Sequence, residues 1–395
     1  MNSWLPEDFR NILSISRREV QAFSHRPLFL FTIILAPVVV VIFFTTLMGA
    51  GLPTKLPAAM VDEDNTKVTR ELGRILASMQ ETRFDYYFDN FEDARKAMQA
   101  GKIYGFFYIP KGTTRKAMSS RQPTISFYTN EAYLVPGSLL MRDFKTMGEL
   151  SGLAVTREGL YARGATEHQA YGIFQGIVLE THPLGNSVLD YSVYLTNMLV
   201  PGLFIILILL AATYTLGYEW KQETQKQWLA MAGGSRIVAL TGKLMPQLLL
   251  FQLMFVGYDV YVFKILQFPC NCGIEMMILW SLFTVIATQA FAIFMFGLFA
   301  GKMRLSMCMC SLWGILSFSI AGFSFPVTAM SPVLQGLAFL FPLRHYYLIY
   351  VNQALYGFSI HYVWTSVAAL LGFTFLPLLV MHRYKAAFDH IKYRA

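Results

Sequence analysis

The sequence predicts an α-helical polytopic membrane protein, with six transmembrane helices and an α/β extracytoplasmic domain between the first two. The 395 residues are 55% hydrophobic and only 14% charged, and the mean hydropathy is +0.45. Soluble domains carry about 25% charged residues, so this balance favours lipid as the solvent. Six apolar stretches reach the ~20 residues that a membrane-spanning helix needs. Lys and Arg gather beside these stretches, in positions that alternating spans would bring to one side of the membrane.

The six predicted spans are residues 28–50, 193–217, 244–266, 274–300, 305–325 and 363–382. Each is read as a helix because backbone groups in hydrocarbon must be satisfied within the segment.

Basic residues next to the spans all fall on one side of the membrane. They are Arg10, Arg17, Arg18 and Arg26 before the first span, Lys221, Lys226, Arg236 and Lys243 after the second, Lys302 and Arg304 after the fourth, and Arg383, Lys385, Lys392 and Arg394 after the sixth. Residues 55–190 hold 16 basic and 16 acidic residues, so the net charge of +8 lies entirely outside them. The positive-inside rule therefore predicts cytoplasmic N- and C-termini in a bacterial inner membrane, and no nucleic-acid surface is needed to explain the charge.

Residues 1–27 do not read as a cleavable signal, because they are polar and a full-length apolar stretch follows them. Phe9, Ile12, Leu13, Ser16, Val20 and Phe23 share one helical face. This spacing predicts a cytoplasmic amphipathic helix at the membrane interface, rather than a frayed basic tail.

Residues 51–192 form the predicted extracytoplasmic domain. Strands are expected at 56–64, 83–90, 103–110 and 124–130, and helices at 66–80, 91–100 and 137–167. Asp62, Glu63 and Asp64 suggest either a metal site or a turn that caps the next helix, and the turn is the better interpretation. We find no catalytic constellation and no metal site in this domain.

The four cysteines do not indicate a metal site. Cys270 and Cys272 fall in the predicted outer loop after the third span, where a disulfide across one residue is strained but feasible. The loop lacks the further ligands of a metal site. Cys308 and Cys310 are expected to pack within the fifth span.

Two features of the spans are candidate sites. Asp259 is an acid well inside an apolar run, with Lys264 following it. It either takes part in transport or has a structural role, in which it pairs with that lysine or reaches the membrane interface; the structural role is favoured. The fifth span carries a stripe of small residues that allows close helix packing: Ser311, Gly314, Ser317, Ala321 and Ser324.

Residues 218–243 form a predicted cytoplasmic segment between the second and third spans. A helix over 219–232 places Trp228 and Leu229 as apolar side chains among Glu, Lys and Gln. Aromatic anchors within polar surroundings are typical of docking surfaces. A helix lying on the lipid surface also uses Trp beside Lys, and it is the alternative.

This segment resembles the signature of ABC-2-type permease subunits. Glu219, Thr224, Leu229, Lys243 and Pro246 fit the family pattern, whereas Glu223 stands in place of a Gly and Lys226 in place of a Glu. The stretches 61–65 and 103–111 are similar to parts of the family's extracytoplasmic insert. Residues 326–362 look like its outer re-entrant hairpin, and 383–395 form a cytoplasmic tail.

The resemblance implies the permease subunit of an ATP-driven exporter of the drug-efflux branch. It implies a cytoplasmic ABC ATPase partner that holds ATP and Mg, a homodimer or a paralogous heterodimer, and a periplasmic adaptor with an outer-membrane channel as further partners. The ATPase-coupling residues would be Glu219, Glu223, Thr224, Gln227, Trp228 and Leu229, and the small-residue stripe would lie at the dimer or pathway. The substrate would be hydrophobic or amphipathic.

The chain itself is not expected to be an enzyme or to hold a cofactor. A phosphate-binding loop requires Ser or Thr after Gly-Lys, but Gly242-Lys243 is followed by Leu, and the other two Gly-Lys pairs by Met and Ile. Two alternatives remain, namely a proton-coupled secondary transporter that uses Asp259 and a membrane-anchored binding or sensory protein.

Overall fold

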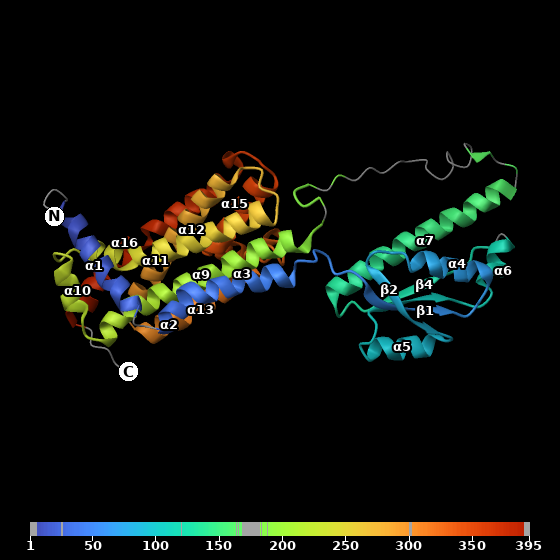
Figure 1. Ribbon diagram of the computed structural model, residues 1–395, viewed down its shortest axis with the longest axis horizontal. Coiled ribbons are helices and arrows are strands. Elements are labelled where there is room, and N and C mark those ends of the chain that lie inside the picture. Colours follow the sequence, from blue (N-terminus) through green and yellow to red (C-terminus); the bar gives the residue numbers. More distant parts are fainter. Residues whose placement is uncertain are drawn as a thin grey trace. The chain divides into compact units, whose positions relative to one another are not determined.

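The computed structural model describes residues 6–24, 27–119, 121–162, 164, 166–167, 182, 184–187, 189–299 and 302–390. The parts of the predictions that fall on 1–5, 25–26, 120, 163, 165, 168–181, 183, 188, 300 and 391–395 lie outside these residues. The chain divides into two compact units, one made of Met1–Gly51 with His182–Ala395 and the other of Leu52–Thr181. The first unit is a helical bundle and the second is an α/β domain (Figure 1).

Within the described residues, five helices of the bundle are long and apolar enough to cross a membrane. They are α9 (Tyr191–Lys221), α11 (Arg236–Val260, continued by a π-helical turn to Ile265), α12 (Ile274–Leu298), α13 (Met303–Ile320) and α16 (Trp364–His390). They correspond to the second to sixth predicted spans. Side chains from all of these helices form one large hydrophobic core.

The first predicted span is also helical, but its apolar helix is shorter. It consists of α2 (Pro27–Leu30), a π-helical turn (Phe31–Leu35) and α3 (Ala36–Leu47). The apolar helix Phe31–Leu47 falls below the length of the other five. The membrane crossing of this segment therefore stays a prediction, and α3 packs along α9.

The N-terminal helix is α1 (Glu7–Ser24). Ile15, Glu19 and Phe23 are buried, and α1 packs on the first turns of α11. Phe9, Leu13 and Val20, on the face predicted to meet the membrane, are exposed. The interfacial position of α1 stays a prediction.

The small-residue stripe of α13 packs within the chain. A Cβ atom at Gly314 would lie 2.5 Å from Ile206 of α9, and one at Gly202 of α9 would lie 2.4 Å from Phe318. Gly314, Ser317 and Ala321 are buried, whereas Ser324 is exposed. These small residues bring α9 and α13 together; their part in a dimer or a pathway stays a prediction.

The predicted outer hairpin contains two short helices. They are α14 (Pro332–Ala338) and α15 (Pro342–Tyr350). A 3-10 turn (Val327–Ala329) precedes them, and a π-helical turn (Val351–Leu355) and a second 3-10 turn (Ile360–Val363) follow. Helix α15 packs against α12 and α16. The outer-loop cysteines Cys270 and Cys272 are both free thiols.

The second unit is built on a four-stranded sheet in the order β2-β1-β3-β4. Strand β1 (Leu56–Asp62) is parallel to β2 (Thr82–Phe88) and to β3 (Gly105–Ile109), and β4 (Ser126–Thr129) is antiparallel to β3. The four predicted strands are confirmed, with ends that differ by a few residues.

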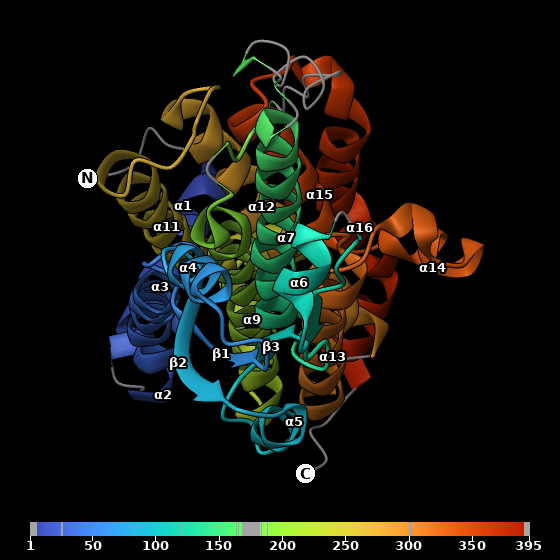
Figure 2. The ribbon, with the colours of Figure 1, turned by 90° about the vertical axis from the view of Figure 1, so that its right-hand side faces the viewer.

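Helices cover both faces of this sheet (Figure 2). They are α4 (Lys67–Leu76), α5 (Phe91–Gln99), α6 (Thr113–Met118) and α7 (Leu134–Ala162), of which α6 was not expected from the sequence. Because strand residues alternate between faces, Ala58 and Met60 of β1 join a core with α4 and α7. Ala59 and Val61 join a second core with α5.

The acidic stretch after β1 is a turn, as the sequence favours. Asp62 Oδ1 accepts the backbone N–H groups of Asp64 and Asn65, and Thr66 caps α4 by accepting from Thr69 N. Asp64 accepts from Gly112 N at 2.6 Å and Thr114 N at 2.9 Å. The pKa of Asp64 is lowered by a hydrogen bond from the Thr114 side chain, aided by these two amides. These bonds tie two loops of the domain together.

Candidate functional site

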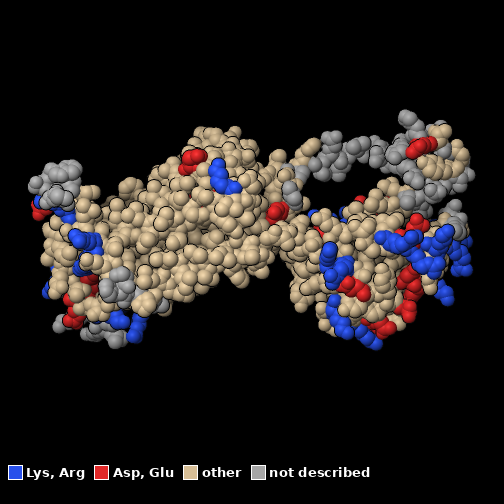
Figure 3. Space-filling view, viewed as in Figure 1, with Lys and Arg blue, Asp and Glu red and all other residues tan. Residues whose placement is uncertain are grey.

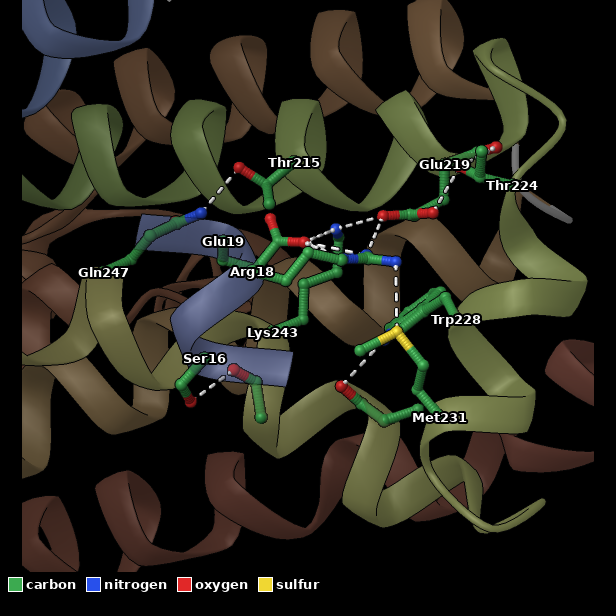
Figure 4. A network of polar contacts seen from close by, with 12 residues as sticks. Ser16, Arg18, Glu19, Thr215, Glu219, Thr224, Trp228, Met231, Lys243 and Gln247 are labelled. Atoms are coloured by element: carbon green, nitrogen blue, oxygen red, sulfur yellow. Dashed lines mark hydrogen bonds and ion pairs between the residues drawn. The ribbon is translucent and has the colours of Figure 1, made fainter. Parts of the chain in front are cut away.

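Four charged side chains meet inside the bundle, at the end where α1 and the short helix α10 (Gln225–Met231) lie (Figure 4). Arg18 and Glu19 come from α1, Glu219 from the last turn of α9, and Lys243 from the second turn of α11. The Lys243 ammonium lies 2.6 Å from Glu219 Oε1 and 2.8 Å from Glu19 Oε1. Arg18 also pairs with both carboxylates. We call these four residues the charge cluster.

The cluster is electrically balanced and almost closed to solvent. Lys243 is 1% exposed, Glu19 2% and Glu219 4%, and only Arg18 reaches the surface. Buried ions are tolerated when they are paired and hydrogen-bonded, whereas removal of one partner strands a charge. The cluster therefore holds α1, α9 and α11 in one fixed arrangement.

The same carboxylate fixes the turn into α10. Glu219 Oε2 accepts the hydroxyl of Thr224 at 2.5 Å, and the Glu219 carbonyl accepts Thr224 N at 2.9 Å. Glu223, between them, takes φ of +56°, a left-handed conformation. Glycine adopts this conformation without strain, and a glycine is the residue that the family pattern has at this position.

The Trp228 side chain connects α10 to the charge cluster within the core of the bundle. Its side chain is fully buried, and its indole Nε1 donates to Ala239 O at 3.2 Å. The Lys243 ammonium lies 5.1 Å from the centre of the ring, within the range of a cation–π contact. Trp220 of α9 meets the ring edge to face, with centroids 6.2 Å apart.

The expectation that Trp228 is an exposed docking anchor is therefore wrong. A seven-residue helix has too few turns for its apolar side to be read from the sequence, and here that side faces the bundle. Leu229 is half-buried and packs at the edge of the same core. The exposed side chains of the turn and helix include Glu223, Lys226 and Gln227, beside Gln222 and Ala230.

The predicted coupling residues thus divide into two groups. Glu219, Thr224, Trp228 and the half-buried Leu229 are internal supports, and Glu223 and Gln227 are left on the surface. Arg18 and Glu19 were not predicted as site residues. Glu19 carried a signal, since it lies between Ile15 and Phe23 on one stripe of α1, and a charge within an apolar stripe calls for a partner.

Further contacts around the charge cluster also join helices α1, α9, α10 and α11. Ser16 Oγ donates to Gly242 O at 2.8 Å, and Arg18 contacts Met231 Sδ of α10 at 3.9 Å. One turn further along the bundle, Gln247 of α11 donates to Thr215 of α9 at 2.6 Å (Figure 4). Helices α1, α9, α10 and α11 consequently form one connected element.

Asp259 does not pair with Lys264. Asp259 is fully buried within the bundle, whereas Lys264 is exposed, and no ion pair joins them in the described part of the chain. Of the two structural roles expected from the sequence, pairing with Lys264 or reaching the interface, pairing is wrong because Asp259 is buried and Lys264 is exposed. Among the described residues, no group of three or more His, Cys, Asp or Glu could hold a metal ion.

Charged side chains avoid the middle of the bundle. On the face seen in Figure 3, Lys, Arg, Asp and Glu gather at the end that holds α1 and α10, and a long uncharged stretch follows. This distribution is typical of helices that cross a membrane.

Comparison with known proteins gives one match. The profile of the family described as ABC-2 family transporter protein matches residues 27–381. No curated protein and no solved structure matches the chain.

Proposed function

The chain belongs to the ABC-2 transporter family, and from this premise we propose that it is the permease subunit of an ATP-driven exporter. Membership supports a membrane permease component of an ABC transporter and implies a separate ATPase subunit. Export, rather than import, is the proposed direction. The cargo is proposed to be a hydrophobic or amphipathic molecule taken from the cytoplasm or the membrane.

The observation that carries the coupling mechanism is the charge cluster with its attached helix. An ATPase that closes on ATP can move only what it touches, so the permease needs a stiff element at its surface. Helix α10 is bound through Thr224 and Trp228 to Glu219 and Lys243, which lie on two different spanning helices. A displacement of α10 would therefore be passed to α9 and α11 together.

The docking surface in this proposal is the exposed side of the α9–α10 turn and of α10. Glu223, Lys226 and Gln227 supply polar side chains of both signs there. Such a surface steers an oppositely patterned partner and fixes its orientation.

The assembly around the subunit follows from the same proposal. Two permease copies, or one copy and a paralogue, pair with two ATPase subunits in a bacterial inner membrane. The chain crosses six times with both termini cytoplasmic, which places the Leu52–Thr181 unit outside the cytoplasm. That unit would present the cargo to a periplasmic adaptor and an outer-membrane channel.

Purification from native membranes tests the proposal. We expect an ATPase with a complete phosphate-binding loop to accompany the chain in mild detergent, and phosphate release to be lost when that partner is stripped away. ATP hydrolysis by the chain alone, or a preparation that transports on a proton gradient without any ATPase, would overturn it.

A further inference from the structure

A groove runs along the bundle between α11, α12 and α16, away from the charge cluster. Its volume is about 380 Å³. Helix α12 contacts both of the other helices and supplies the floor, with Ile286, Gln289, Ala290 and Ile293 at successive helical turns. Helices α11 and α16 form the two walls.

The lining is almost entirely hydrocarbon. Of its three polar side chains, two bond within the protein, since Thr374 donates to Leu371 O at 2.6 Å and Gln289 to Leu244 O at 3.4 Å. The third, Thr241, is exposed at the edge of the groove. The rims are open, because Phe375 and Leu378 of α16 are exposed on the outside of the bundle. On helices that cross a membrane, such a groove opens into the acyl-chain region of the bilayer.

One end of the groove is cationic. Arg236 lies one turn before the lining residue Leu240 on α11, and its Nη1 donates to Met381 O of α16 at 3.1 Å, so it crosses from one wall to the other. Lys385 lies one turn beyond Met381 on the same stripe of α16 and is exposed. Neither residue takes part in an ion pair within the described chain. A guanidinium has five N–H donors, so Arg236 keeps donors for a ligand.

We propose that this groove binds an anionic phospholipid. One acyl chain would occupy the hydrocarbon lining, and the phosphate would lie between Arg236 and Lys385. Apolar length and a cationic end match the two parts of such a lipid, and the volume suits a single chain. The bound lipid would come from the leaflet on the α1 side, and it would join α11 to α16.

Native mass spectrometry of the full chain in detergent, titrated with phosphatidylglycerol or phosphatidylcholine, tests the proposal. We expect the first phosphatidylglycerol to bind more tightly than phosphatidylcholine. Lys385→Gln should weaken its binding about fivefold, the effect of one basic residue at a membrane surface. Arg304→Gln removes an exposed cation at the start of α13, outside the groove, and should leave the affinity unchanged.

A second pair of variants tests the hydrocarbon part. Thr241→Phe fills the groove from an exposed lining position and should remove the tight site. Leu249→Phe adds the same ring at an exposed position of α11 outside the groove and should not.

Equal affinity for the two lipids would overturn the headgroup assignment. If Thr241→Phe and Leu249→Phe have the same affinity for phosphatidylglycerol, the lipid binds around the bundle and not in the groove, and the proposed site is wrong. If Thr241→Phe fails to fold, Lys385→Gln still decides, since it changes an exposed side chain.

Discussion

Lys243 is the residue on which the charge cluster depends most, because it touches both carboxylates and the ring of Trp228. Replacing it by Met leaves Glu19 and Glu219 with one shared cation. We expect Lys243→Met to lower the free energy of unfolding by about 3–5 kcal/mol, the range for breaking a buried pair. Thermal unfolding of the purified chain measures this. Lys226→Met, at an exposed position of α10, is the matched control, and equal stability of the two variants would show that the cluster contributes nothing.

Trp228 gives a second test based on a single residue. As an internal support, its loss should destabilise the chain in the absence of any partner, and Trp228→Ala is expected to cost about 3–5 kcal/mol. Gln227→Ala, next to it and exposed, should change stability by less than about 0.5 kcal/mol. Differential scanning fluorimetry of the isolated chain compares the two. A stable Trp228→Ala chain that fails only in partner binding would restore the surface-anchor interpretation.

At the scale of elements, the close approach of α1 to α11 depends on a glycine. A Cβ atom at Gly242 would lie 3.0 Å from Ile15 Cβ and 3.1 Å from Ile12 O. We expect Gly242→Leu to push α1 away and to expose it to limited proteolysis, at a cost of about 1–3 kcal/mol from overpacking. Gly257→Leu, on the same helix with nothing within 4 Å, should leave cleavage of α1 unchanged. Equal cleavage in both variants would contradict the packing described.

Elements were predicted from the sequence far better than the contacts between them. Apolar length identified α9, α11, α12, α13 and α16, and short apolar or alternating runs identified the four strands, because these signals are local. The charge cluster is not local: Glu19 and Lys243 are 224 residues apart, and no spacing rule pairs them. The burial of Trp228 was missed for the same reason, since the core that covers it comes from α9, α11 and α16.

At the scale of the whole molecule, the sides of the membrane can be tested directly. Reporter fusions after residues 27, 225, 303 and 390 should report the cytoplasm, and fusions near 120, 270 and 345 the periplasm. The basic residues at the α1 and α10 end motivate this assignment. The short helix Phe31–Leu47 makes the fusion at 120 the most informative one. A cytoplasmic signal there would show that this segment does not cross.

In the proposed mechanism, the ATPase docks on the exposed side of α10 and moves the bundle through the charge cluster. Photocrosslinking in the full assembly, with a benzophenone side chain in place of Gln227, tests this docking. We expect a crosslink to the ATPase from position 227, and none from Gln267, which is exposed beyond the far end of α11. A crosslink to lipid alone from position 227, with the ATPase still bound to the chain, would rule out docking on α10.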